Sequence, residues 1–183
     1  KLAAIVFTDI VGFTKLTSED QTAASELLKK QRELFQPKVK QFNGDWVKEL
    51  GDGLLIIFNT ATEAVKCCIE LQKVSKGTSG LNIRIGIHLG EVLIENEDVI
   101  GDDVNIASRI EPFSAPGGIA ISNKIFDAIN REKEYETKYI GRPKLKGVRQ
   151  KVEIFCISSH DLPETRISDV SAKLEILEKK SFK

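Results

Sequence analysis

Two aspartates stand where the chain could bring metal-binding oxygens together. Asp9 follows the apolar, strand-forming run at residues 2–7, and Asp52 lies between Gly51 and Gly53 in a turn that separates two strand-like runs. Carboxylates are oxygen ligands for Mg²⁺, and a pair of such ions about 3.5–4 Å apart clamps the oxygens of a phosphoryl displacement. Aspartate also favours ordinary turns, which is the alternative for each residue. A first strand beside the hairpin would make the two carboxylates converge.

Two further groups are suited to phosphate. The turn Gly12-Phe13-Thr14 precedes a helix, where free backbone N–H groups bind phosphate oxygens; a simple connection is the alternative. Asn105 and Arg109 are four residues apart, so in a helix they share one face. Arginine grips phosphate through a fork of N–H groups and asparagine donates to sugar or phosphate oxygens, which suits phosphoryl transfer. The alternative is a solvated face on which Arg109 pairs with Asp102 or Glu111.

The composition excludes several classes of protein. The chain has 183 residues, which suits one domain, and its 27 basic and 27 acidic residues cancel, which argues against nucleic acid as a partner. No apolar run approaches the roughly 18 residues that would span a bilayer, so we expect no membrane contact from this segment. Cys67, Cys68 and Cys156 are odd in number, which favours a reducing, cytoplasmic location over disulfides. His88 and His160 do not stand at zinc-ligand spacing with them.

Apolar periodicity and turn signals predict alternating strands and helices. Ile83, Ile85 and Ile87 alternate with other residues, which indicates a strand with one buried face. A capping box at residues 60–63 marks a helix start, and Pro37 is expected to end or kink the helix before it. Strands are predicted at residues 2–7, 46–47, 54–58, 82–89, 92–94, 119–121, 139–140 and 152–157, and helices at 17–37, 60–77, 102–111 and 122–129.

The order of these elements predicts the fold class. The chain opens as strand-helix-strand-strand-helix-strand, so we expect an α/β fold: a ferredoxin-like βαββαβ sandwich with a mixed sheet and an additional C-terminal strand and helix subdomain. We place the domain at residues 1–157 and a polar tail, outside the core, at residues 158–183. Because the chain contains no methionine, we interpret it as a domain of a longer protein with regulatory domains elsewhere.

Five separated segments resemble the catalytic domain of class III nucleotidyl cyclases, the adenylyl and guanylyl cyclases, and most closely a bacterial-type adenylyl cyclase. They occur in collinear order between about residues 2 and 157. The segments are FTDIVGFT at 7–14, VKELGDG at 47–53, RIGIHLG at 84–90, DVIGDDVNIASR at 98–109 and LKG at 145–147. The last is uninformative alone, but the combination is specific.

The resemblance implies roles for the metal and phosphate groups. Asp9, Asp52 and the backbone carbonyl of Ile10 would bind two divalent cations, Mg²⁺ or Mn²⁺. The amides of residues 12–14 would hold the triphosphate, and Lys146 would contact its terminal phosphates.

The resemblance also implies a nucleotide. Lys48 and Asp98 fall on the base-reading positions, where lysine donates to a ring nitrogen and aspartate accepts from the adenine amino group; guanine presents a carbonyl there, so the pair favours ATP over GTP. A solvated strand lysine and one member of an acidic run are the alternatives. Asn105 would orient the ribose, and Arg109 would stabilise the transition state at the α-phosphate. His88 we interpret as structural, because the sequence gives it no partner.

Together these roles predict an adenylyl cyclase that converts ATP to 3′,5′-cyclic AMP and pyrophosphate by attack of the ribose 3′ oxygen on the α-phosphate. The resemblance places the metal aspartates and the Asn/Arg groups on opposite sides of an interface, so a homodimer with two shared active sites is expected. The alternatives are a catalytically silent cyclase-homology module that binds nucleotide or only dimerises, and a guanylyl cyclase.

Overall fold

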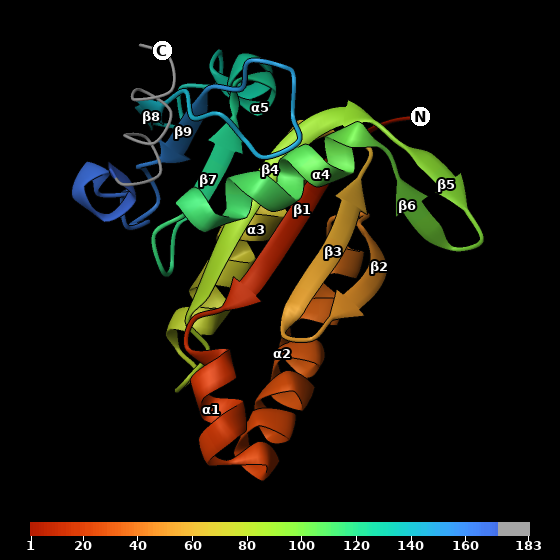
Figure 1. The fold of residues 1–183 in the computed structure, drawn as a ribbon, viewed down its shortest axis with the longest axis vertical. Helices are drawn as coiled ribbons and strands as arrows, with labels where there is room; N and C mark the ends of the chain where they lie inside the picture. The colour runs from red at the N-terminus through yellow and green to blue at the C-terminus, as the bar shows by residue number, and fades with distance from the viewer. Residues whose placement is uncertain (172–183) are drawn as a thin grey trace.

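Seven strands form one mixed sheet through the centre of the molecule (Figure 1). The computed structural model describes residues 1–171. The strand order is β2-β3-β1-β4-β7-β9-β8, in which β4 and β7 run parallel and all other neighbours run antiparallel. The strands of this sheet are β1 (Leu2–Ile10), β2 (Asp45–Leu50), β3 (Gly53–Phe58), β4 (Ile83–Glu91), β7 (Ile119–Ser122), β8 (Thr137–Gly141) and β9 (Ile154–Ile157). With β1 between β3 and β4, the predicted ferredoxin-like arrangement is confirmed.

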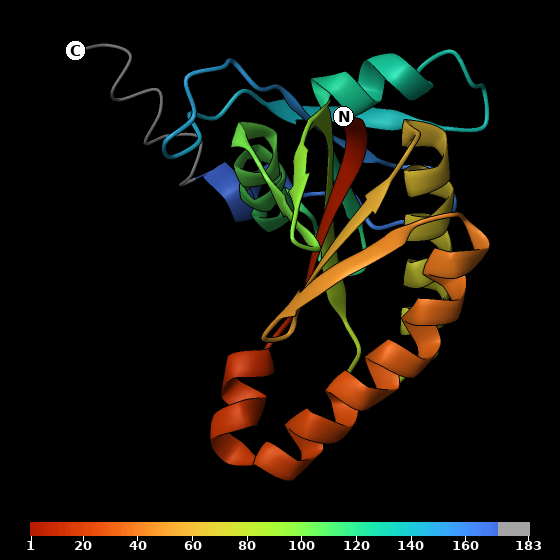
Figure 2. The ribbon, with the colours of Figure 1, turned by 90° about the vertical axis from the view of Figure 1, so that its right-hand side faces the viewer.

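Helices cover both faces of this sheet, and a small hairpin projects from one side of it. Figure 2 shows α2 and α3 on one side of the strands and α4 on the other. The helices are α1 (Phe13–Glu19), α2 (Gln21–Gln41), α3 (Ala61–Lys76), α4 (Asp102–Ile110) and α5 (Asn123–Ile129), with a 3-10 turn η1 (Glu111–Phe113) directly after α4. The hairpin consists of β5 (Leu93–Glu95) and β6 (Asp98–Ile100). Its second strand lies in a stretch that the sequence analysis treated as a connection.

The first strand is apolar on both sides because the core is divided by the sheet. Ala4 and Val6 belong to the cluster that includes α3, whereas Ala3 and Ile5 pack with Ala107 of α4 on the opposite face. A strand covered on both faces reads as a continuous apolar run, as residues 2–7 do. Asp9 continues the alternation on the α4 side of the sheet.

The segment predicted as one helix from residue 17 is two helices. Asp20 has an extended backbone and separates them, and its carboxylate accepts the N–H of Ala23 at 3.0 Å, which caps α2. The predicted start at residue 17 is therefore wrong for α2, which begins after its cap Asp20. Pro37 lies inside α2, which continues to Gln41. Phe35 and Val39, on either side of the proline, are buried in the core, and this packing holds both halves of the helix.

The tail that was expected outside the core packs against it where the structure describes it. Leu162, Thr165 and Val170 are buried, and the hydroxyl of Thr165 donates to the carbonyl of Phe113 at 2.7 Å. The expectation was wrong here because three well-spaced residues suffice to anchor a segment whose average composition is polar. Residues 172–183 lie outside the described part of the chain.

Candidate active site

Asp9 and Asp52 lie side by side at one end of the sheet. The pairing of Thr8 with Leu54 carries the end of β1 past the tip of the β2–β3 hairpin. There the backbone N–H of Ile10 donates to Oδ2 of Asp52 at 2.7 Å. Gly53 permits this approach, because a Cβ on it would lie 2.9 Å from the carbonyl oxygen of Thr8. The expected convergence of the two loops is what the structure shows.

A third carboxyl group, which was not predicted from the sequence, lies beside them. Glu111, in η1, is 9% exposed and hydrogen-bonds to Asp9. Its pKa is raised to about 9, chiefly because burial disfavours the charged form, and further because Asp9 accepts its proton and Asp52 adds negative charge. The raised pKa favours the neutral form of Glu111, which can donate its proton to Asp9. Arg109, which the sequence alternative paired with Glu111, forms no ion pair with any described residue.

A glycine in the neighbouring strand lets this turn approach the sheet. A Cβ on Gly86 of β4 would lie 2.4 Å from the backbone nitrogen of Glu111. This glycine, together with a glutamate at the end of a predicted helix, is the only sequence signal that pointed toward Glu111. Neither feature identifies Asp9 as its partner without the strand order.

The chemistry of the two aspartates fits a hard divalent cation. Oδ1 of Asp9 and Oε2 of Glu111 are both buried, and when both groups are ionised neither has a hydrogen-bond partner among residues 1–171. A proton on Glu111 gives Asp9 one partner and no more. A buried acceptor without a partner is costly, and a cation that prefers oxygen ligands removes that cost. Within the same range, no group of three or more histidine, cysteine or acidic side chains is arranged to hold a metal. Any cation here therefore depends on the two carboxylates, a backbone carbonyl and oxygens supplied by a ligand.

The turn before α1 lies immediately beyond these aspartates. Gly12 has a left-handed backbone, with φ 78°, and no side chain caps the start of α1. Phe13 and Thr14 therefore begin the helix with amides that no capping side chain satisfies. These are the amides that the resemblance assigns to the triphosphate.

Lys48 and Asp98 meet although 49 residues separate them in sequence. Nζ of Lys48 lies 2.9 Å from Oδ1 of Asp98, which brings β2 and β6 together. The hydrogen bond from Lys48 holds the pKa of Asp98 below its usual value, and the backbone N–H of Val99 adds to this effect. Both side chains remain about two-fifths exposed, so a ligand can reach them. The alternatives given from the sequence, a solvated strand lysine and one member of an acidic run, did not predict that the two side chains contact each other.

Asn105 and Arg109 form a further group on the exposed side of α4. Ile106, Ala107 and Ile110 bury the opposite side of this helix. Asn105 lines a hollow of about 410 Å³ together with residues 147–150. Lys146, which is exposed, directly precedes that loop.

His88 has two partners, contrary to the expectation from sequence. Its ring is 2% exposed, with Nδ1 2.8 Å from the hydroxyl of Ser122 and Nε2 2.9 Å from Oδ1 of Asp103. Burial lowers the pKa of His88, although the hydrogen bond to Asp103 opposes the shift. The partners were not visible in the sequence because one is on α4 and the other at the end of β7.

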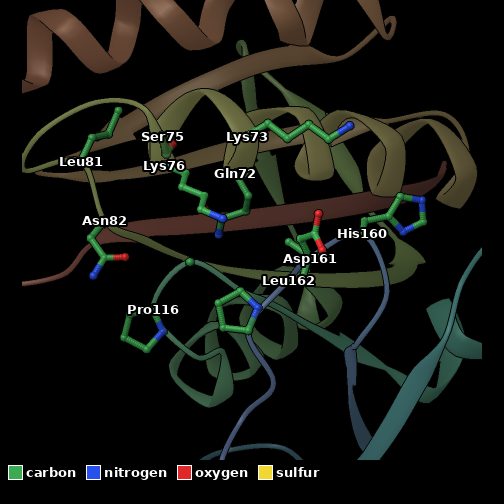
Figure 3. A pocket seen from close by; sticks show the side chains of 12 residues that line it. Gln72, Lys73, Ser75, Lys76, Leu81, Asn82, Pro116, His160, Asp161 and Leu162 are labelled. Carbon is green, nitrogen blue, oxygen red and sulfur yellow. The ribbon is translucent and has the colours of Figure 1, made fainter.

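A separate pocket of about 330 Å³ lies beside α3 (Figure 3). Gln72 and Lys76 of α3 line one side of it, and Asn82, Pro116 and Leu162 lie on the other. None of the residues predicted to bind metal or substrate lines this pocket. In the described part of the chain, no helix combines the length and apolar character that crossing a membrane requires.

Known proteins share both the sequence and the fold. The family model for the adenylate and guanylate cyclase catalytic domain matches residues 1–159. A Rhizobium meliloti (strain 1021) protein, named as a candidate adenylate cyclase, is 32% identical over 169 residues, which cover 88% of this chain and 29% of that protein. This chain therefore spans less than a third of that relative.

Two solved structures give the same result for the fold. The adenylyl cyclase CyaB from P. aeruginosa superposes with a TM-score of 0.76 at 27% identity, covering 89% of this chain and 97% of that one. The catalytic core of a rhodopsin-guanylyl cyclase with converted specificity, in complex with ATPαS, superposes with a TM-score of 0.78 at 26% identity, covering 87% and 96%. Together with the family match over most of its length, these likenesses show that the chain belongs to the class III adenylyl and guanylyl cyclase catalytic-domain family.

Proposed function

We propose that this domain is an adenylyl cyclase that converts ATP to 3′,5′-cyclic AMP and pyrophosphate. The observation that carries the choice of ATP is the contact between Lys48 and Asp98. It presents one donor and one acceptor at a spacing that suits a ring nitrogen and the neighbouring exocyclic amine of adenine. The lowered pKa of Asp98 keeps its carboxylate ionised, as an acceptor must be.

The reaction is a displacement within one nucleotide. The ribose 3′ oxygen forms a bond to the α-phosphorus as the bond to the bridging oxygen of pyrophosphate breaks, and the hydroxyl proton leaves to solvent. Asn105 orients the ribose, and Arg109 stabilises the charge that develops on the α-phosphate. Both stand on the exposed face of α4, where a nucleotide can reach them. The amides of residues 12–14 and the ammonium of Lys146 bind the remaining phosphates.

Asp9, Asp52 and the carbonyl of Ile10 would hold two divalent cations, Mg²⁺ or Mn²⁺. When bound, such ions activate the attacking oxygen and neutralise the triphosphate. Oδ1 of Asp9 is buried where no described residue other than a protonated Glu111 donates to it, which supports this assignment. Glu111 keeps Asp9 in place by donating a hydrogen bond to it.

The active site is shared between two copies of the chain. We assign the metal-binding aspartates to one protomer and the Lys48, Asp98, Asn105 and Arg109 groups to its partner, so that a homodimer contains two equivalent sites. Neither Asp9→Ala nor Arg109→Ala should then be active alone. Mixing the two variants should restore one intact site in each heterodimer, and failure of the mixture to turn over ATP despite confirmed dimerisation would contradict shared sites.

The product identifies the activity directly. The purified domain is incubated with ATP or GTP and with Mg²⁺ or Mn²⁺, and the product is identified by its mass. Cyclic AMP from ATP is the expected result. Cyclic GMP from GTP in its place would make the domain a guanylyl cyclase, and no cyclic nucleotide from either would make it a silent module. The fold alone does not exclude a guanylyl cyclase, because the solved rhodopsin-guanylyl cyclase core with converted specificity has the same fold.

The setting of the domain is also a proposal. All three cysteines are free and buried, in keeping with a reducing cytoplasmic compartment. The large remainder of the Rhizobium relative is where regulatory domains would lie in a protein of that kind. The domain boundary near residue 157 stays a prediction.

A further inference from the structure

The helix that carries Asn105 and Arg109 has few directional contacts with the sheet. It spans nine residues, and its N-cap is Gly101, which offers no side chain to cap it. A helix this short is marginal alone and depends on tertiary contacts. Its apolar face packs through Ile106, Ala107 and Ile110, but apolar contact is not directional and does not by itself fix rotation or sliding.

Asp103, in the first turn of α4, supplies the missing directional contact. Its Oδ1 lies 2.9 Å from Nε2 of His88, and its Oδ2 accepts the backbone N–H of Glu91 at 2.9 Å. Both carboxylate oxygens are thus bound to β4, at two positions on one strand. Two hydrogen bonds to one carboxylate define its orientation as well as its position.

The strand has a space that fits this carboxylate. A Cβ on Gly90, between the two donors, would lie 2.1 Å from Cγ of Asp103. Any other residue at this position would displace the start of α4. The docking of Asp103 is therefore part of the close packing between strand and helix.

His88 is itself fixed by a second element. A carboxylate only accepts hydrogen bonds, so Nε2 of His88 carries the proton, and Nδ1 accepts from the hydroxyl of Ser122 at 2.8 Å. Ser122 in turn caps α5 by accepting the N–H of Ile125 at 3.4 Å. The ring thus has one tautomer and one orientation. The hydroxyl of Ser122, at the start of α5, fixes that orientation, and Nε2 then donates to Asp103.

We propose that His88 is a positioning residue for the reaction, which through Asp103 sets the orientation of α4 and so of Asn105 and Arg109. The inference rests on the proposed cyclase activity. Asn105 lies two residues after Asp103, and Arg109 lies six residues after it. A rotation or translation at the start of the helix therefore moves both groups. A displacement of about 1 Å costs on the order of a hundredfold in rate when the groups act in the transition state.

Two substitutions of His88 separate this role from simple space filling. His88→Gln keeps a donor near the position of Nε2, whereas His88→Asn keeps an acceptor near Nδ1 but is too short to reach Asp103. We expect His88→Asn to lower kcat by about ten- to a hundredfold with KM nearly unchanged, because the misplaced groups act mainly in the transition state. His88→Gln should recover most of that loss. Equal kcat for the two variants would overturn the proposal.

Asp103→Ala and a structural measurement complete the test. Asp103 is one-fifth exposed, so its truncation leaves the core intact even if a His88 variant does not fold. It should reproduce the kcat loss, and His88→Asn combined with it should lose no more, because both remove one contact. Hydrogen exchange at the amides of residues 104–110 should accelerate in Asp103→Ala and His88→Asn but not in His88→Gln. Unchanged exchange in Asp103→Ala would overturn the proposal, whereas an unmodified domain that turns over neither ATP nor GTP but shows the exchange pattern would overturn only the cyclase activity.

Discussion

Replacing Gly86 by alanine should destabilise the domain and slow its reaction together. The new Cβ would lie 2.4 Å from the nitrogen and 2.6 Å from Cα of Glu111, and these are backbone atoms that no side-chain rotation can move away. Since ordinary contact begins near 3.4 Å, η1 must withdraw by about 1 Å. Overpacking of this kind costs about 1–3 kcal/mol, and the relief of replacing a strand glycine offsets roughly 0.5–1 kcal/mol. We therefore expect a net loss of about 1 kcal/mol, or roughly 2–4 °C in Tm.

The same shift should weaken the support of Asp9. Glu111 moves with η1, and its hydrogen bond to Asp9 lengthens. We expect kcat to fall about ten- to a hundredfold, because a displacement of reacting groups by about 1 Å lowers the rate by up to about a hundredfold.

A matched glycine provides the control for both effects. At Gly77 a Cβ would meet only the carbonyl oxygen of Val74, at 3.8 Å, and φ is −82°, which alanine adopts freely. Gly77→Ala should therefore keep both stability and kcat. Urea unfolding and a cyclic-nucleotide assay measure the two quantities. Equal unfolding free energies for the two variants would refute the packing argument, and a destabilised Gly86→Ala with normal kcat would refute the link from η1 to Asp9.

Three shorter predictions concern the base, the metals and pH. Lys48→Ala should raise KM for ATP about tenfold while changing the unfolding free energy by less than about 1 kcal/mol, because its ion pair is exposed; steady-state kinetics and urea unfolding check this. Chelation should abolish turnover, and Mg²⁺ should restore it in the unmodified domain but not in Asp52→Asn, with calorimetry showing the lost metal binding. Burial lowers the pKa of His88 in the folded chain. Below about pH 6.5 the unfolded chain therefore takes up a proton that the folded chain does not, and the free energy of unfolding decreases as the pH is lowered. The groups that face this ring are Asp103, which opposes the shift, and Lys124, which adds to it. Urea unfolding at about pH 7.5 and 5.5 should show a larger fall for the unmodified domain than for His88→Gln, and parallel curves would argue against the assignment.

Much of the fold could be predicted from the sequence because its signals are local. The continuous apolar run of β1 and the capping box at Thr60 each follow from neighbouring residues, and the structure confirms them. The alternation in β4 correctly predicted a strand, but the single buried face was wrong, because α4 and η1 cover Gly86 and His88 on the other face. Even the meeting of Asp9 with Asp52 was predictable, since the ferredoxin-like order places the first strand beside the hairpin. Where local signals competed, the prediction was wrong: Asp20 divided one expected helix, and core packing carried α2 through Pro37.

The sequence by itself determined the family and the types of group available for chemistry, because the matching segments are contiguous strings. Only the tertiary structure decided which residues hold those groups in position. Glu111 reaches Asp9, and His88 reaches Asp103, 15 residues away, because α4 and η1 cross the face of β4 opposite α3. His88 reaches Ser122, 34 residues away, because β7 pairs with β4. Such contacts depend on the order of strands and the direction of a crossing helix. No pattern within a single element encodes either of these.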